Sequence, residues 1–389
     1  MAAVRTVSLS SPWLDEREEE LVLEVLRSGR LSLGPTVDRF EEAFAEAVGA
    51  PYAAAVSSGT AGLHLLCVAA GIGPGDEVVT SPVSFVASAN CALYTGATPV
   101  FADVDRRTLN LDPKAVEAVL TPRTRAVVAV DIFGYPCELD ELRALCERHG
   151  LVLIEDACEA LGARYRGRPL GAHGPSAVFA FYPNKQITTA EGGMVTTHSE
   201  EEWRLLCSLR NQGRADAGGW LEHARLGFNY RLDDVRAALG LGQLEKLDEI
   251  LARRAAVAAR YRELLAGVEG LELPCPDDEA HERSWFVYVV VLPEDADREA
   301  VIAALDQRGV QTARYLPCIH LQPYLRERFG FAPGLCPVAE DVSARSLALP
   351  FHTRLGEDDQ AYVASALADA LGATGGSARA ASSTSSGRS

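Results

Sequence analysis

Lys185 is the side chain whose surroundings point most directly to chemistry. It lies in the segment FAFYPNKQITTAEGGMV, between two apolar runs typical of strands. Only three of the 37 basic residues are lysines, and we expect the other two, Lys114 and Lys246, to be solvated among charged neighbours on helices. A partly desolvated lysine loses proton affinity and becomes a nucleophilic amine. Taken alone, Lys185 could equally be a loop lysine that reaches solvent.

A carboxylate and a tight turn precede this lysine along the chain. Asp156 ends the buried strand-like run LVLIED, and ligands of open α/β sheets bind beyond the carboxyl ends of strands. A carboxylate at that edge can pair with a pyridinium nitrogen and keep it protonated. Gly59 and Thr60, in SSGTAG, fall where a strand turns into a helix, and such a helix start can bind a phosphate. Singly, the acid could be a helix cap or an ion-paired residue, and the turn a plain N-cap.

The three features occur in the order phosphate turn, carboxylate, lysine. Pyridoxal 5'-phosphate (PLP) needs contacts of these three kinds, for its phosphate, its ring nitrogen and its aldehyde. Their conjunction is much rarer by chance than any one of them, so the sequence predicts a PLP site.

Composition argues against several other classes of protein. Hydrophobic residues make up 48% and charged residues 23%, as in ordinary globular proteins, and the net charge of −17 disfavours a nucleic-acid partner. The nine cysteines form no CxxC pair or zinc spacing, so we expect reduced thiols and no metal. No apolar signal core is present and no apolar run reaches the roughly 20 residues of a membrane span. We therefore expect a cytoplasmic protein without membrane contact.

Short apolar runs alternate with helical stretches through the first part of the chain. The runs DEVVTSP, ATPVFADVD, TRAVVAVDIF and LVLIEDA are separated by helical patterns such as 112–120 and 138–149, and SAVFAFYP and GGMVTTH add two more strands. This alternation predicts an α/β fold with a mostly parallel sheet flanked by helices. A long helix over about 232–266 would lead out of this domain.

The pattern changes after Pro274. WFVYVVVL predicts a strand, REAVIAALDQRG a helix, VQTARYLP another strand, and 357–371 a final helix. We expect a large domain over residues 1–250 and a smaller C-terminal α+β domain over 251–372. The tail at 373–389 has almost no large apolar side chains and is predicted to be disordered.

The chain resembles the DegT/StrS family of sugar aminotransferases, which are PLP enzymes of fold type I. The resemblance extends from about residue 10 to 370, and its motifs are jointly specific. The matching segments are SGRLSLGP, VSSGTAGLHLL, SFVASANCALYTGATPVFADVD, LIEDACEALGARYRG, FAFYPNKQITTAEGGMV, LRNQGR, GFNYRLDDVRAALGLGQLEKLD and LPCIHLQPY.

The resemblance implies roles for particular positions. Lys185 would hold PLP as a Schiff base, and Asp156 would pair with the pyridine nitrogen. Gly59 and Thr60 would hold the phosphate. Phe85, in SFVASAN, would stack on the ring face, with core packing as the alternative.

Other implied roles concern a second subunit and the sugar. Asn229, in GFNYRL, would reach the phosphate from the neighbouring subunit, so a homodimer with shared active sites is expected. Arg231 and His320 fall in segments that line the sugar site in similar enzymes. Each could equally be a structural hydrogen-bonding residue.

Three positions depart from the family's pattern. Ala180 stands where many members carry a serine that touches the phosphate. Glu159 stands where glutamine or histidine is common near the phenolic oxygen of PLP, and we assign it to the cofactor pocket as an acid that is protonated or turned away. Ala190 replaces the glycine often seen in TTGEGG.

The implied reaction moves an amino group in two halves. L-glutamate would give the group to the cofactor, and a nucleotide-linked 4-keto-6-deoxy sugar would receive it, for an amino sugar of a polysaccharide or glycoside. A 3-keto sugar or a keto-cyclitol is the alternative acceptor. A sugar dehydratase of the same fold would carry histidine in place of Lys185, and a non-enzymatic regulator lacks support because no basic helix-turn-helix segment is present.

Overall fold

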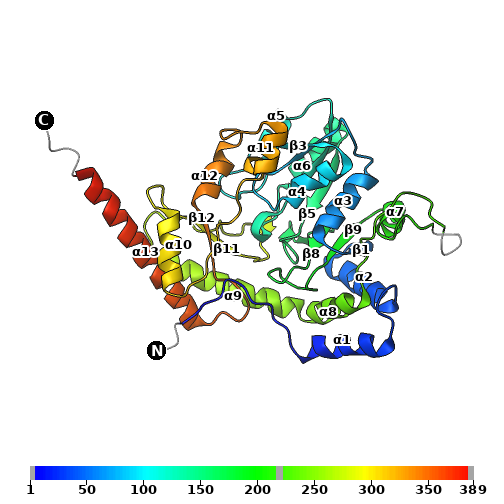
Figure 1. Ribbon diagram of the computed structural model, residues 1–389, viewed down its shortest axis with the longest axis horizontal. Helices are drawn as coiled ribbons and strands as arrows, with labels where there is room; N and C mark the ends of the chain where they lie inside the picture. The colour runs from blue at the N-terminus through cyan, green and yellow to red at the C-terminus, as the bar shows by residue number, and fades with distance from the viewer. Residues whose placement is uncertain (1–4, 216–221, 384–389) are drawn as a thin grey trace.

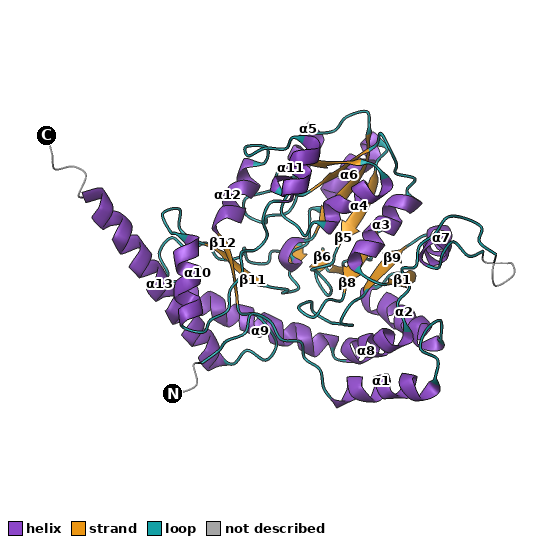
Figure 2. Ribbon diagram, viewed as in Figure 1, coloured by secondary structure: helices purple, strands orange, loops and turns teal. Residues whose placement is uncertain are grey.

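The computed structural model describes residues 5–215 and 222–383, and its centre is a seven-stranded sheet (Figures 1 and 2). The order of the strands across the sheet is β1-β9-β8-β5-β4-β2-β3. The strands of this sheet are β1 (Tyr52–Val56), β2 (Glu77–Thr80), β3 (Thr98–Phe101), β4 (Thr124–Val130), β5 (Val152–Asp156), β8 (Ser176–Ala180) and β9 (Gly193–Thr197).

All neighbours in this sheet are parallel except those of β9, which runs antiparallel to both β1 and β8. The carboxyl ends of the other six strands therefore share one edge, as the strand–helix alternation predicted. In the middle of that edge Asp156 of β5 is level with Val130 of β4 and Val178 of β8.

Helices cover both faces of the sheet (Figure 2). One face carries α1 (Glu16–Ser28), α2 (Pro35–Val48), α5 (Pro113–Ala118), α6 (Leu139–His149) and α8 (Asp234–Glu245), and the other α3 (Gly59–Ala69), α4 (Ala87–Thr95) and α7 (Glu200–Arg210). Alternation along each strand supplies both cores: in β4, Val127 and Ala129 join the first and Ala126 and Val128 the second.

A separate core, apart from the two on the faces of the large sheet, lies around a small two-stranded sheet at the other end of the molecule (Figure 1). The strands β11 (Tyr288–Val291) and β12 (Ser346–Leu349) pair antiparallel. The helices of this part of the chain are α9 (Leu247–Leu265), α10 (Arg298–Gln307), α11 (Pro323–Phe329), α12 (Pro337–Arg345) and α13 (Glu357–Ser383). Cores of this kind fit the expected large and small domains, whose boundary at residue 250 stays a prediction.

The strand expected over VQTARYLP is wrong. Residues 310–317 make only isolated bridges, between Val310 and Val7 and between Ala313 and Ala348. The partner of β11 is instead the buried run SLAL of β12. After Ala313 the chain leaves the sheet toward Pro317, which has no N–H group to donate to a ladder.

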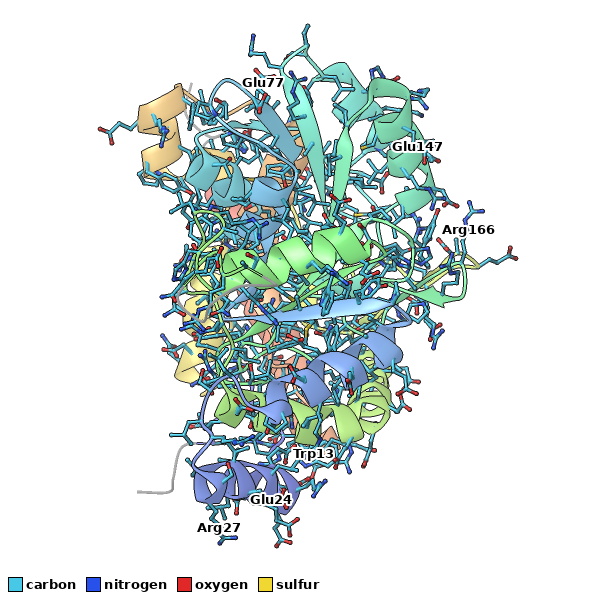
Figure 3. The ribbon with its side chains drawn as sticks, turned by 90° about the vertical axis from the view of Figure 1, so that its right-hand side faces the viewer. Trp13, Glu24, Arg27, Glu77, Glu147 and Arg166 are labelled. Carbon is cyan, nitrogen blue, oxygen red and sulfur yellow. The ribbon has the colours of Figure 1, made fainter. Side chains whose placement is uncertain are left out.

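The long helix expected over 232–266 is two helices, because α8 and α9 meet at a non-helical residue, Lys246 (φ −118°, ψ 17°). The expectation that this lysine is solvated is also wrong. Its side chain is only 12% exposed, and Nζ lies 2.7 Å from carboxylate oxygens of both Asp15 and Glu18. Figure 3 shows α1 at the bottom of the molecule, with Trp13 just before it.

Smaller elements complete the described chain. A three-stranded sheet joins β10 (His281–Glu282), β6 (Arg164–Tyr165) and β7 (Arg168–Pro169), and short 3-10 helices cover Ile132–Gly134 and Ile319–Leu321. Helix α13 continues to Ser383, since adding residues to a formed helix costs little, and residues 384–389 lie outside the described chain. Disorder of the tail in solution stays a prediction. Within residues 5–215 and 222–383, no helix is long and apolar enough to cross a bilayer.

Candidate active site

The carboxyl edge of the large sheet gathers the residues singled out in the sequence. Gly59 begins α3 just beyond β1, Asp156 ends β5, and Lys185 follows β8 by a short turn. Because β1, β5 and β8 are mutually parallel, all three features lie at the same edge. The Glu159 carboxyl group lies 3.5 Å from Lys185 Nζ and within electrostatic range of Asp156.

Lys185 is held by its backbone and confined at its amine. Its N–H donates to the carbonyl oxygen of Tyr182 at 2.9 Å, and its own carbonyl accepts from Arg254 Nη2 at 3.0 Å. The side chain is 13% exposed. Its Nζ lies 4.1 Å from the centre of the Phe286 ring and 3.5 Å from Glu159 Oε1. The amine therefore occupies a partly desolvated position, as the sequence suggested.

Asp156 is a buried carboxyl group with few partners. Its Oδ2 accepts a hydrogen bond from the Ser88 hydroxyl at 2.7 Å, and its Oδ1 accepts from the Cys158 N–H at 3.3 Å. Ser88 lies in the first turn of α4, next to the loop that carries Phe85. The acceptor capacity that remains on Asp156 can take a proton-bearing ring nitrogen.

Glu159 lies between the backbone of one loop and the amine of Lys185. Its Oε2 accepts from the Phe133 N–H at 3.0 Å. Burial raises the pKa of the Glu159 carboxyl group above its usual value, and the charge of Lys185 opposes that rise only in part. The sequence predicted an acid that is either protonated or turned away from the pocket. In the structure Glu159 is not turned away, since it faces the amine of Lys185.

The start of α3 lies where the sequence predicts a phosphate site. Ser58 caps the helix by accepting from the Ala61 N–H at 3.1 Å, and the first N–H groups of a helix have no partner within it. A Cβ at Gly59 would lie 2.8 Å from Cys158 Sγ and 2.9 Å from the Cβ of Ala180, so only glycine fits. The alanine at 180, where a serine was noted as common, thus packs directly against this turn.

The remaining predicted residues lie in different settings. Phe85 is 62% exposed, so its ring is not part of the core of this chain. Asn229 is exposed and its backbone forms an isolated antiparallel β-bridge with Asn211. Arg231 donates from Nη1 to Asn211 Oδ1 at 3.0 Å. The described contacts place neither Asn229 nor Arg231 against Lys185.

His320 is fully buried. Its Nε2 lies 2.9 Å from Glu340 Oε1 and its ring is tilted against that of Phe101. In this structure His320 contacts protein atoms, which matches the structural alternative noted for it, and a role toward the sugar stays a prediction.

Several residues that shape the site were missed in the sequence. Ser88, Phe133 and Phe286 gave no local signal, because each reaches the site from a distant segment. Arg254 did give one. It falls on the apolar stripe of α9, at helical spacing from buried residues, and an arginine there is unusual; the stripe comprises Leu247, Ile250, Val257, Ala258, Tyr261 and Leu265.

Comparison with known proteins identifies the family of the chain. Residues 12–368 match the model of the DegT/DnrJ/EryC1/StrS aminotransferase family. The spore coat polysaccharide biosynthesis protein SpsC of Bacillus subtilis strain 168 is 40% identical over 373 residues, which cover 92% of this chain and 96% of SpsC. The GDP-perosamine synthase of Caulobacter vibrioides is 40% identical over 375 residues, which cover 95% of this chain and 100% of that enzyme.

Solved structures show the same fold. DesV of S. venezuelae, in complex with a ketimine intermediate, superimposes with a TM-score of 0.87 at 36% identity, over 93% of this chain and 98% of DesV. The architecture is that of PLP-dependent transferases of fold type I, with a mostly parallel sheet between helical layers. The chain therefore belongs to the DegT/DnrJ/EryC1/StrS family of aminotransferases, as the sequence resemblance indicated.

Proposed function

We propose that this protein uses PLP to transfer an amino group from L-glutamate to a nucleotide-linked keto-sugar, with a 4-keto-6-deoxy sugar as the acceptor. The observation that carries the proposal is the Lys185 amine, held 3.5 Å from Glu159 at the sheet edge where Asp156 ends β5. Family membership makes amino transfer the reaction class. The donor and the sugar are the parts that the proposal adds.

The side chains at this edge fit PLP. An amine for an aldehyde, a buried carboxylate for a ring nitrogen and a helix start for a phosphate are present together. Phe85 offers an exposed ring on the loop before α4, and the first turn of α4 carries Ser88, the partner of Asp156. The group would be held by Lys185, Asp156, Gly59, Thr60 and Phe85.

PLP, when bound, supplies an electron sink for the bond that breaks at the amino-bearing carbon. Asp156 would keep a proton on the ring nitrogen, and Ser88 would fix the carboxylate in that orientation. Lys185 would hold the aldehyde carbon of PLP before the reaction. Once displaced by the donor's amine, it would carry the proton between the amino-bearing carbon of the donor and that aldehyde carbon. Glu159 would face the phenolic oxygen side and exchange a proton with Lys185.

The acceptor is proposed from the relatives. A GDP-perosamine synthase and a polysaccharide biosynthesis protein are each 40% identical over nearly full length, which supports an amino-sugar product. The proposed substrate site includes Arg231 and His320. A 3-keto sugar or a keto-cyclitol would require the same chemistry at Lys185 and is the alternative acceptor.

We also propose a homodimer in which Asn229 of one subunit completes the site of the other. Asn229 is exposed and does not contact Lys185 of its own chain in the described residues. Phe85 and Tyr182, on the segments that lead to Ser88 and Lys185, are also exposed, at 62% and 52%, and Leu226, three residues before Asn229, is 87% exposed. Exposed apolar patches mark interaction surfaces.

Complementation tests the shared site. Mixed dimers of Lys185→Ala and Asn229→Ala chains contain one site free of both changes, so they should regain activity that neither homodimer has. Mixed dimers that stay inactive, or a monomeric wild-type protein in sedimentation, would reject the shared site.

Spectroscopy tests the cofactor and the donor. Purified protein with PLP should absorb in the visible region, and L-glutamate should bleach this absorbance with release of 2-oxoglutarate. Adding the correct keto-sugar nucleotide should restore it. Absorbance that persists in L-glutamate would reject glutamate as the donor, and protein that binds no PLP would reject the function.

A reducing, cytoplasmic location is part of the proposal. None of the nine cysteines, all of which lie in the described residues, forms a disulfide, and six of them are buried among apolar side chains of the core clusters. Thiols in this setting are typical of proteins kept reduced. The six are Cys67, Cys91, Cys137, Cys146, Cys318 and Cys336.

A further inference from the structure

Arg254 is a buried guanidinium group whose hydrogen bonds, among the described residues, all go to backbone carbonyls, and which also lies over the Phe351 ring. It lies on α9 and is 3% exposed. Its Nη1 donates to the carbonyl of Phe286 at 3.0 Å, and its Nη2 donates to the carbonyl of Lys185 at 3.0 Å. A third, longer contact of 3.5 Å joins Nη1 to the carbonyl of Trp285.

A charge buried in this way is costly. Arg254 takes part in none of the ion pairs found in residues 5–215 and 222–383, and the same holds for Arg283, which is 8% exposed. By contrast Arg210, whose side chain is 14% exposed, pairs with Glu41. Burial without an acid lowers the pKa of Arg254 to about 10. A well-packed apolar side chain would avoid this desolvation. The presence of arginine therefore calls for a reason beyond filling space.

The two carbonyls at 3.0 Å belong to residues whose side chains meet. Lys185 Nζ lies 4.1 Å from the centre of the Phe286 ring. One rigid fork on α9 thus fixes both the backbone of the lysine and the backbone of the ring that its amine contacts. The three residues are far apart in sequence, so no local structure could replace this link.

We propose that Arg254 is a positioning residue that sets the place of the Lys185 amine relative to the reacting aldehyde. This inference rests on the proposed function, because it gives Arg254 its purpose through Lys185. A planar guanidinium directs two N–H groups in a fixed geometry, whereas a lysine ammonium is a single point on a flexible stem. Lysine at 254 would retain the charge and lose the simultaneous grip on the two carbonyls.

The test compares Arg254→Met with a matched control, Arg298→Met. Arg298 also donates from Nη1 to two carbonyls, those of Ser343 at 2.6 Å and Ser346 at 3.3 Å, but none of its contacts involves Lys185 or Phe286. Each variant is mixed with PLP well below its own melting temperature. The rate at which visible absorbance forms, and the pH at which that absorbance titrates, are recorded together with the melting temperature.

We expect Arg254→Met to form the absorbance about tenfold more slowly or worse, because a displacement of about 1 Å is costly for reacting groups. Its titration should move or broaden, while Arg298→Met should match the wild type in both despite a lower melting temperature. If Arg254→Met is insoluble, Arg254→Lys carries the test, with an intermediate rate expected.

The outcomes separate the two levels of inference. A soluble Arg254 variant whose rate and titration equal those of Arg298→Met would overturn the positioning role and leave the proposed function intact. A wild-type protein that forms no visible absorbance with PLP would overturn the proposed function itself.

Discussion

The carboxylate of Glu159 lies 3.5 Å from the amine of Lys185, and the two side chains are 7% and 13% exposed. An acid this close to a buried amine is placed to exchange a proton with it. The proton on the lysine is the one that must leave before the amine can attack an aldehyde. Glu159 therefore has direct influence on when the lysine becomes reactive.

Replacing Glu159 with glutamine should slow the capture of PLP by Lys185. The change removes an acid 3.5 Å from the amine that can take up the proton which the amine must lose, and proton transfer to a positioned side chain commonly contributes about 100-fold to a rate. The rate of PLP capture, followed by visible absorbance, should therefore be lower in Glu159→Gln than in the wild type. Identical rates for variant and wild type would show that Glu159 does not act on the amine.

Lys185→Ala should abolish the visible absorbance with PLP and all amino transfer. Lys246→Ala is the matched control, because Lys246 is also nearly buried and paired with acids, Asp15 and Glu18, but lies on the α1 side of the sheet. It should retain the absorbance while losing thermal stability. Absorbance that survives in Lys185→Ala would overturn the assignment of the cofactor lysine.

Asp156→Asn should separate cofactor capture from catalysis. The neutral amide cannot hold a proton on the ring nitrogen, so the half-reaction with L-glutamate should slow by about 100-fold or more, while PLP capture changes little. Ser88→Ala, which removes only the 2.7 Å hydrogen bond to Asp156, should slow the half-reaction less. Single-turnover kinetics measure both, and an Asp156→Asn enzyme with the wild-type rate would contradict the assigned role.

Glu155 should make the protein less stable as pH rises. It is fully buried, Oε1 accepts from the Gly171 N–H at 3.2 Å, and burial raises its pKa to about 8. The folded state thus binds a proton that the unfolded state has lost, so the stabilisation present below the unfolded pKa disappears between about pH 4.5 and 8. The free energy of unfolding should fall there by roughly 1 kcal/mol per pH unit from this group.

Glu155→Gln should flatten this dependence. Urea titrations at pH 5, 6, 7 and 8 compare the slopes of the two proteins. The pKa of Asp131 is also raised, first by burial and in part by the charge of Glu155, so stability should still fall with pH to some extent in the variant. Equal slopes in both proteins would mean that Glu155 ionises normally despite its burial.

Ala190→Gly should stabilise the loop after Lys185. Ala190 has a φ of 65°, in the left-handed region that costs residues with a Cβ roughly 1–2 kcal/mol. Glycine should recover about 1 kcal/mol of this, measured by urea unfolding. The control Ala252→Gly, in the interior of α9, should instead destabilise by about 1 kcal/mol. Destabilisation by both changes would show that the loop is not strained at 190.

The residues at the carboxyl edge of the large sheet could be predicted because their positions follow from the order of strands along the chain. Asp156 and Gly59 were found by their places at strand ends, and the structure puts them on one edge with Lys185. The glycine often seen in place of Ala190 also has a physical reason, since the positive φ at this position is the conformation for which glycine is suited.

The supports of the site were not predictable in the same way. The bonds from Ser88 to Asp156 and from Arg254 to Lys185 join residues 68 and 69 positions apart. Neighbouring arginines on α9 show the difficulty: Arg253 is 47% exposed and pairs with Glu249, while Arg254 turns inward. Only helical phase distinguishes them. Residue type gave no warning of the break at Lys246, where tertiary ion pairs end a helix without proline or glycine.

The N-terminal segment has a consequence for how the protein is made. Val7 donates to the Gly309 carbonyl and accepts from Gln311, and Leu9 accepts from Phe351. The Leu9 N–H also bonds the Gln311 side chain across 302 positions. On the ribosome, residues 5–9 emerge long before these partners exist, so the backbone groups of this segment stay unpaired until residues 309–351 have been made. The core around β11 and β12 can close only after β12 has emerged, which makes that closure a late step of folding.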